Sequence, residues 1–201
     1  ITLRTQTAFP TALKQSAFDI NWLFVHPSTS QFDSKPLVAI IGSRESTSDQ
    51  MQNARNAAGE VAGMGGYVIT GLATGADTAA YEGAILQQGK VIGVLGTGIQ
   101  RMYPKENIKT LSHIIERNGS ILSELPPQAP GNKTSFILRN RIIAALADVV
   151  VVVSGKYYSG TSHTIRFGKQ MGKTLISIDQ SKHSGISKLI AELGGKVITP
   201  D

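Results

Sequence analysis

The chain has 201 residues, is 41% hydrophobic and carries a net charge of +6, so it can bury one hydrophobic core and has an excess of basic side chains. It contains no cysteine, which excludes disulfides and thiolate metal sites. No run approaches the roughly 20 apolar residues that span a bilayer, and the first residues lack a signal-peptide pattern. We therefore expect a soluble, cytoplasmic protein without a membrane partner. Because the chain begins with Ile1, we expect a piece of a longer protein.

Residues 1–35 precede the regular part of the sequence. They carry scattered aromatic residues and end in a turn-rich stretch. We expect them to form an N-terminal extension that packs on the main domain, with residues 22–25 as an added strand.

Residues 36–201 alternate short runs of apolar, β-branched residues with segments of helical spacing. The expected strands are 37–41, 67–70, 91–95, 121–123, 149–153, 174–178 and 196–199. The expected helices lie near 48–63, 75–88, 105–117, 135–147, 161–171 and 185–193. The fifth strand is apolar on both faces, as a strand buried in a parallel sheet must be. This alternation predicts an α/β domain with a doubly wound, mostly parallel sheet and helices on both of its faces.

In doubly wound folds, ligands bind beyond the carboxyl ends of the strands. Four of the expected strands are followed there by glycine and small hydroxyl residues, whose N–H and O–H groups can hold phosphate. Neither a complete dinucleotide-binding fingerprint nor a Walker sequence is present, so no NAD or nucleoside triphosphate site is predicted and no cofactor is expected. The four loops contain Gly42-Ser43-Arg44, Thr70-Gly71 through Gly75, Gly96-Thr97-Gly98, and Ser154-Gly155 with Ser159-Gly160-Thr161.

The excess positive charge is concentrated in residues 131–173. This segment has seven basic residues and one acidic residue, while the other 158 residues carry 13 of each sign. Such clustering favours a polyanionic partner, although a solvated basic face is the alternative.

The helix expected at 135–147 combines an apolar arc with a polar one. On a helical wheel, Phe136, Arg139 and Asn140 fall opposite the apolar arc, close to Lys133. An aromatic ring among cations is typical of proteins that stack unpaired bases and hold their phosphates. The alternative, which the neighbouring Ile143 supports, is that Phe136 tucks under the preceding loop. The apolar arc, expected to face the sheet, consists of Leu138, Ile142, Ala145 and Leu146.

Several motifs resemble the DNA-processing A (DprA/Smf) family. They occur in the family's order and at matching spacing over nearly all of residues 9–199, and the combination of Gly-Ser-Arg, Tyr-Pro-x-x-Asn and Arg-Asn-Arg is specific. The motifs are VAIIGSR at 38–44, TGLATGADTAAYEGAI at 70–85, VIGVLGTGIQRMYPKEN at 91–107, GSILSELPP at 119–127, F-x-x-R-N-R-I-I-A-x-L at 136–146, SGT with GK at 159–173, and LI-x-x-x-G-G at 189–195.

The resemblance implies an extended Rossmann-like domain, here without the winged-helix domain of some members. It implies a non-enzymatic protein that binds and protects single-stranded DNA. It further implies a homodimer that promotes loading of the RecA recombinase in natural transformation. Arg141 is interpreted as structural. The implied DNA-contacting residues are Arg44, Lys133, Phe136, Arg139, Asn140 and the loop Ser159-Gly160-Thr161, together with Lys169 and Lys173.

The chain departs from the family pattern at several positions. Thr74 replaces an arginine, Tyr81 a histidine and Ser154 an acidic residue. These changes place the chain on a divergent branch.

Two other functions use the same fold. One is a sensor that binds a small nucleotide without cleaving it. The other is cleavage of nucleoside monophosphates, as in lysine-decarboxylase-like proteins, for which Glu82 and Glu124 are the candidate carboxylates. No metal site is expected, because the histidines are scattered over different elements. They are His26, His113, His163 and His183.

Overall fold

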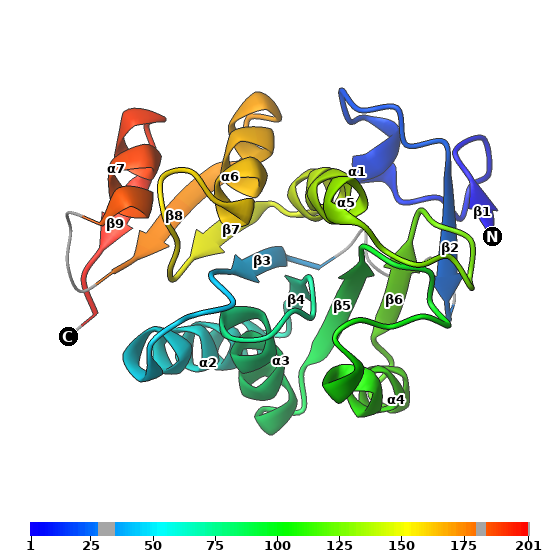
Figure 1. Cartoon of the computed structure of the whole chain (residues 1–201), viewed down its shortest axis with the longest axis horizontal. Coiled ribbons are helices and arrows are strands. Elements are labelled where there is room, and N and C mark those ends of the chain that lie inside the picture. Colours follow the sequence, from blue (N-terminus) through cyan, green and yellow to red (C-terminus); the bar gives the residue numbers. More distant parts are fainter. Residues whose placement is uncertain (28–34, 180–183, 201) are drawn as a thin grey trace.

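The computed structural model describes residues 1–27, 35–179 and 184–200. Over these ranges the chain forms one nine-stranded sheet in the order β1-β2-β6-β5-β4-β3-β7-β8-β9, with helices on both faces (Figure 1). All neighbours from β6 to β9 in this order are parallel, whereas β1 and β2 are antiparallel to each other and β2 is antiparallel to β6. The predicted α/β class, with its doubly wound and mostly parallel sheet, is confirmed.

Most elements lie close to the ranges expected from the sequence, but β1 and α1 were not predicted, and the helix expected near 105–117 is a 3-10 helix followed by α4. The strands are β1 (Thr2–Leu3), β2 (Trp22–His26), β3 (Leu37–Ile41), β4 (Tyr67–Thr70), β5 (Lys90–Leu95), β6 (Ser120–Ser123), β7 (Val149–Val152), β8 (Thr174–Ile178) and β9 (Lys196–Ile198). The helices are α1 (Thr11–Lys14), α2 (Ser48–Gly63), α3 (Ala76–Leu86), the 3-10 helix η1 (Lys105–Asn107), α4 (Ile108–Glu116), α5 (Lys133–Leu146), α6 (Gly160–Gln170) and α7 (Gly185–Glu192).

Helix α5 begins at Lys133 because Asn132 caps it. The Asn132 Oδ1 accepts from the Ser135 N–H at 2.9 Å, and the Ser135 Oγ accepts from the Asn132 N–H at 2.8 Å. Such a reciprocal capping box satisfies two backbone donors that the first turn would otherwise leave unpaired. The Ser135 hydroxyl also donates to the Gly96 carbonyl at 2.7 Å, which ties the start of α5 to the loop after β5.

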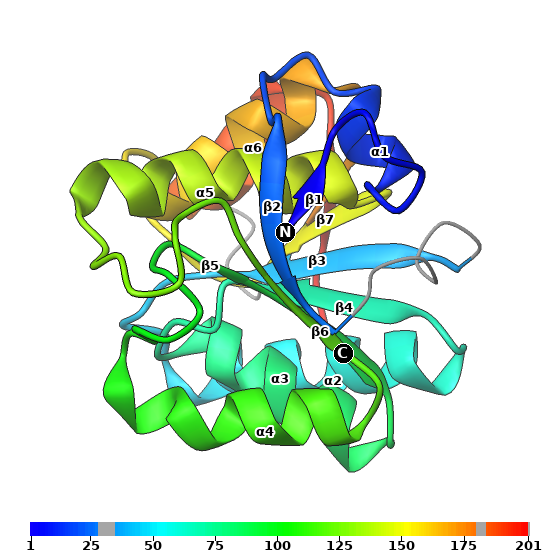
Figure 2. The same ribbon diagram turned by 90° about the vertical axis from the view of Figure 1, so that its right-hand side faces the viewer.

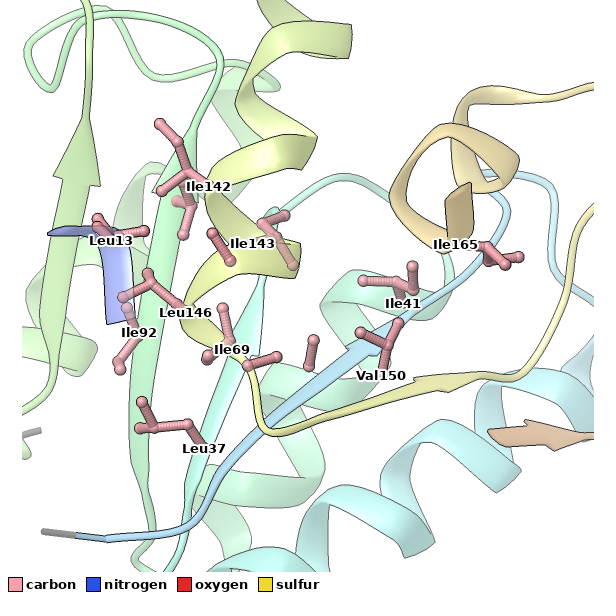
Figure 3. Close-up of a cluster of buried hydrophobic side chains, with 14 of the residues drawn as sticks. Leu13, Leu37, Ile41, Ile69, Ile92, Ile142, Ile143, Leu146, Val150 and Ile165 are labelled. Atoms are coloured by element: carbon pink, nitrogen blue, oxygen red, sulfur yellow. The ribbon is translucent and has the colours of Figure 1, made fainter. Parts of the chain in front are cut away.

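The helices form two layers around the sheet. Helices α2, α3 and α4 cover one face, while α1, α5, α6 and α7 cover the other (Figures 1 and 2). On the second face, Ile142, Ile143 and Leu146 of α5 are buried against aliphatic side chains of the central strands, among them Ile69 and Ile92 (Figure 3). This packing holds α5 across the middle of the sheet.

On the other face, α2 and α3 approach each other closely. Their buried positions are rich in alanine, and Gly83 of α3 faces the backbone of α2. A Cβ atom at Gly83 would lie 2.1 Å from the Arg55 carbonyl oxygen, so the observed approach requires glycine there. Small side chains thus set the separation of these two helices.

Residues 1–27 extend the same sheet. Strand β2 pairs with β6, and the Trp22 indole Nε1–H donates to the Glu124 carbonyl at 2.9 Å. Leu13 of α1 and Leu23 of β2 are fully buried in the core beneath α5. The strand expected at 22–25 is therefore present, and the turn-rich residues 28–34 lie outside the described part. Among the helices described, none has the length and apolar character required to cross a bilayer.

Candidate nucleic-acid interface

The candidate site lies at the carboxyl edge of the sheet, where β3 and β7 are neighbours. The chain leaves β3 toward β4 on one side and leaves β7 toward β8 on the other, so the two following loops diverge and open a crevice. Ser154 ties these loops together, because its Oγ accepts from the Ser43 N–H at 2.8 Å and lies 2.7 Å from the Ser46 Oγ. A Cβ atom at Gly42 would lie 2.4 Å from the same Ser154 oxygen, so this contact requires glycine.

Two adjoining cavities occupy this crevice, and we call them together the groove. The smaller cavity, of about 320 Å³, is lined by nine of the residues predicted from the sequence to contact DNA or bind phosphate. The larger, of about 930 Å³, shares a wall with it and adds Lys133. The nine residues are Gly42, Ser43, Arg44, Phe136, Arg139, Asn140, Ser159, Gly160 and Thr161. The larger cavity is lined by Arg44, Lys133, Phe136, Ile137, Tyr157, Tyr158, Ser159, Gly160, Ser162, His163 and Arg166.

Phe136 stands between the cavities and is half-buried. One side of its ring packs against the loop after β5, since a Cβ atom at Gly96 would lie 2.4 Å from the Phe136 Cδ1. The ring also lies 5.5 Å from the Arg44 guanidinium carbon and 5.9 Å from the ring centre of Tyr103. The ring thus packs on a loop and also lines the groove beside a cation, and base stacking on it stays a prediction.

Arg139 differs from the expectation of the helical wheel. The wheel placed it opposite the buried arc, but its side chain is 8% exposed and points under α5 toward the strands. It donates to the Gly71 carbonyl at 2.7 Å and to the Val94 carbonyl. Leu138, which the wheel assigned to the buried arc, is 45% exposed. The buried face of α5 is therefore shifted by about one residue from the face that the helical wheel predicted.

The loop after β4 explains why Arg139 lies on the buried face of α5. A Cβ atom at Gly71 would lie 2.5 Å from the Arg139 Nη1, so glycine leaves the space that the guanidinium fills. Asn140 is also buried, and its amide donates to the Gly160 carbonyl at 3.1 Å. These two contacts join α5 to the loop after β4 and to the start of α6, so both side chains support the walls of the groove.

The buried Asp77 side chain lies within electrostatic range of the Arg139 guanidinium. Burial raises the pKa of Asp77, while the Arg139 guanidinium and the backbone N–H groups of Ala73, Gly42 and Gly71 act to lower it. Burial lowers the pKa of Arg139 to about 10, against the effect of Asp77. Arg139 therefore stays protonated at neutral pH, and the pair gathers the loops after β3 and β4 around one buried charge centre.

The basic residues that are clustered in the sequence do not form one surface. Lys169 and Lys173 lie at the opposite edge of the sheet from the groove, because α6 runs back across the sheet before β8 begins. Lys173 lines a separate cavity that also contains Asp148. Arg141 pairs with Glu124, with 2.6 Å between the Nη2 and Oε2 atoms. Lys169 and Lys173 therefore lie apart from the groove that the other implied DNA-contacting residues line, and their DNA contacts stay a prediction.

Three aromatic residues and one cation of this region were missed by sequence reasoning. Tyr157, Tyr158 and Arg166 line the larger cavity, and Tyr103 lies against Phe136 in a small adjoining cavity that Gly71 and Thr74 also line. The available signal was the Tyr-Tyr pair directly before the Ser-Gly-Thr loop.

Histidine and carboxylate groups give no metal centre in the described ranges, where no group of three or more could hold a metal ion. His163 lines the larger cavity. His183 lies outside the described residues.

The sequence model of the family described as DNA recombination-mediator protein A matches residues 1–200. The chain belongs to this family. The DNA processing protein DprA of Bacillus subtilis is 33% identical over 144 residues, which cover 72% of this chain and 48% of that protein. That of Streptococcus pneumoniae is 36% identical over 170 residues, which cover 82% and 58% of the two chains. The chain thus spans about half the length of these relatives.

Two solved structures of the family share the fold over nearly the whole chain. The X-ray structure of DprA from S. pneumoniae has a TM-score of 0.87 at 28% identity and covers 98% of this chain and 70% of its own. DNA processing protein A from Helicobacter pylori has a TM-score of 0.81 at 30% identity, with 94% and 87% covered. That structure is described for its single-stranded DNA binding mode. The resemblance found in the sequence motifs is confirmed.

Proposed function

We propose that the groove binds single-stranded DNA. The observation that carries the proposal is the placement of Phe136, whose half-buried ring lines both cavities beside the Arg44 guanidinium. Proteins that bind single strands combine aromatic rings, on which unpaired bases stack, with cations that follow the phosphates. Lys133 at the start of α5 supplies a second cation. The relative from H. pylori, described for single-stranded DNA binding, supports the same ligand.

The size of the groove favours a strand over a compact nucleotide. The smaller cavity, of about 320 Å³, is at the lower end of the range for small-ligand sites. The larger, of about 930 Å³, opens from the same wall and carries the remaining aromatic and basic side chains. A ligand that occupies both must be longer than a single nucleotide, and its bases must be unpaired to reach the rings.

The carboxylates favour binding without catalysis. Glu82 pairs with Arg55 at 2.8 Å and Glu124 pairs with Arg141, so both candidates for glycosidic cleavage are engaged outside the groove. Asp77 lines the smaller cavity but is buried against Arg139. General acid–base chemistry needs a group within hydrogen-bond reach of the reacting atom. Glu45 also lines the smaller cavity. An assay for release of free base from nucleotides tests whether it acts in catalysis.

The wider role that we propose is that of a recombination mediator. The chain would protect bound single strands and promote the loading of a RecA-type recombinase during DNA uptake and recombination, as a homodimer in the cytoplasm. Family membership supports this role. It is tested by recombinase filament formation on single-stranded DNA, which the wild-type chain should accelerate and a groove variant should not.

The binding test uses labelled oligo-dT, with duplex DNA and free mononucleotides as competitors, over a series of salt concentrations. We expect oligo-dT to bind more tightly than either competitor. The logarithm of its affinity should fall with the logarithm of salt concentration by about 0.7 for each phosphate contact. Oligo-dT binding no tighter than a mononucleotide would overturn the proposal in favour of a nucleotide sensor, and release of free base would indicate a hydrolase.

A further inference from the structure

Tyr158 lies at the rim of the larger cavity with its side chain almost fully in solvent. Its exposed fraction is 85%, the largest among the exposed hydrophobic residues of the described chain. A single exposed aromatic residue is common and by itself indicates nothing. Tyr158, however, lines the same cavity as Phe136, at the end of the loop after β7.

The ring of Tyr158 rests on a neighbour that is held in place. Tyr157 and Tyr158 have ring centres 4.9 Å apart in an edge-to-face arrangement. The Tyr157 hydroxyl donates to the Glu192 Oε2 of α7 at 2.5 Å, and the Arg166 guanidinium carbon of α6 lies 5.7 Å from the Tyr157 ring centre. Two helices therefore fix Tyr157, and Tyr158 is presented against it at little further cost in side-chain entropy.

The charge around the larger cavity has one sign. Among the described residues that line it, Arg44, Lys133 and Arg166 are basic and none is acidic. Two of these cations stand beside a ring, Arg44 at Phe136 and Arg166 at Tyr157. The cavity thus has two aromatic residues that each lie beside a cation, which matches a polyanion that carries stackable bases.

We propose that Tyr158 is a second base-stacking residue. A strand that stacks one base on Phe136 continues through the larger cavity and stacks another base on Tyr158, with Lys133 and Arg166 toward the intervening phosphates. This inference rests on the proposed function of the groove. It adds a contact that this chain's Tyr-Tyr pair supplies, and it predicts a binding site longer than the Phe136 position alone requires.

The test uses the shortest oligo-dT that binds the wild-type chain with full affinity, so that the strand cannot slide. An abasic site is placed at each position in turn. We expect two separate positions at which the missing base weakens binding. Tyr158→Ala should weaken binding of the intact strand by about 5- to 150-fold. It should also abolish the effect of the abasic site at one of the two positions only. Phe136→Ala should abolish it at the other.

Matched variants separate stacking from folding. Tyr158→Phe keeps the ring and should keep full affinity and both sensitive positions. Leu86→Ala, at a residue of α3 that is 76% exposed and outside the groove, should change neither. Thermal unfolding of each variant by circular dichroism checks that the fold is intact.

The outcomes distinguish this inference from the proposed function. If oligo-dT binds and Phe136→Ala weakens it, but Tyr158→Ala leaves affinity and both abasic profiles unchanged, the second stacking residue is refuted and the groove remains a DNA site. If the wild-type chain does not bind oligo-dT, both proposals fail. A single abasic-sensitive position that depends on Phe136 likewise overturns the role of Tyr158.

Discussion

Phe136 has one side in the protein and one side in the groove. Its contact with the loop at Gly96 holds the ring in the wall of the cavities beside the Arg44 guanidinium, so a base would meet a ring that is already ordered. At this residue the local packing and the proposed function need the same geometry. Ser154 supports the groove in a different way, because its hydroxyl bridges the loops after β3 and β7.

We predict that Phe136→Ala weakens the binding of oligo-dT by about 1–3 kcal/mol, because a base loses its stacking partner. Fluorescence anisotropy measures the change. Phe136→Tyr keeps the ring and should bind nearly as the wild type does. Leu138→Ala, two residues further along α5 at a side chain that is 45% exposed, is the control and should have no effect. Equal losses in both alanine variants would argue against stacking.

We predict that Arg44→Ala and Lys133→Ala each reduce the salt dependence of oligo-dT binding. Each removes one cation from the groove, which should lower the slope of log affinity against log salt by about 0.7. The slope is obtained from titrations at several salt concentrations. Lys169→Ala removes the same charge from the opposite edge of the sheet and should leave the slope unchanged. A uniform change in all three variants would show that only net charge matters.

At the scale of elements, two kinds of contact position α5 on the sheet. Its aliphatic face packs on the central strands, and Arg139 reaches past it to the carbonyl groups of Gly71 and Val94. The guanidinium and Asp77 hold the loops after β3 and β4 against the helix. Arg139 lines the smaller cavity and also has this structural role, so its substitution should act on folding before it acts on binding.

We predict that Arg139→Met destabilises the folded chain by about 1–3 kcal/mol, because it leaves the Gly71 and Val94 carbonyl groups without their donor and removes the positive charge near the buried Asp77. Urea unfolding measures the loss. Asp77→Asn in the same chain removes the charge with which Arg139 interacts electrostatically, so the double variant should be more stable than the sum of the single losses indicates. Arg117→Met, at an exposed arginine, should change stability by less than about 0.5 kcal/mol. Strict additivity of the two single losses would contradict the pairing.

The close contact between α2 and α3 predicts how two glycine substitutions change stability. Gly83→Ala should destabilise the chain by about 1–3 kcal/mol, because the new methyl group would overlap the Arg55 carbonyl oxygen. Gly63→Ala is the matched control within α2, where a Cβ atom meets nothing within 4 Å. It should stabilise the helix by about 0.5–1 kcal/mol. Opposite signs in urea unfolding are expected, and equal effects would mean that helix propensity alone governs both sites.

At the scale of the whole molecule, the sheet joins the first residues to the Rossmann-like part. Strand β2 pairs with β6, and Leu23 enters the same core as α5. We therefore propose that residues 1–35 and 36–201 unfold as one cooperative unit, although the sequence divides them by composition.

The lone tryptophan, Trp22 on β2, makes this proposal measurable. We predict that urea unfolding followed by tryptophan fluorescence and by far-UV circular dichroism gives coincident curves. Leu23→Ala, which removes a fully buried side chain, should shift both curves together by about 2–5 kcal/mol of unfolding free energy. A fluorescence transition that precedes the other would show that the N-terminal strands are a separate unit.

The sequence by itself determined the α/β class, most elements from β2 onward and the loops at the carboxyl edge. Strand and helix periodicity is local, and glycine with serine or threonine after a strand needs no knowledge of distant residues. The wall that contains Gly42, Ser43 and Arg44 was predictable for the same reason. The family motifs indicated Phe136 on the opposite wall, although the helical wheel misplaced Arg139 and Leu138 beside it.

Only the tertiary structure decided which charges share a surface. Arg139 is buried because Gly71, 68 residues away in the chain, leaves space for its guanidinium, and no wheel of α5 alone contains that fact. Lys169 and Lys173 lie far from the groove because a crossover helix carries its two ends to opposite edges of the sheet. Tyr158 lies beside the groove because β7 is the neighbour of β3. Charge and aromatic clustering are properties of distance in space, which sequence separation does not measure.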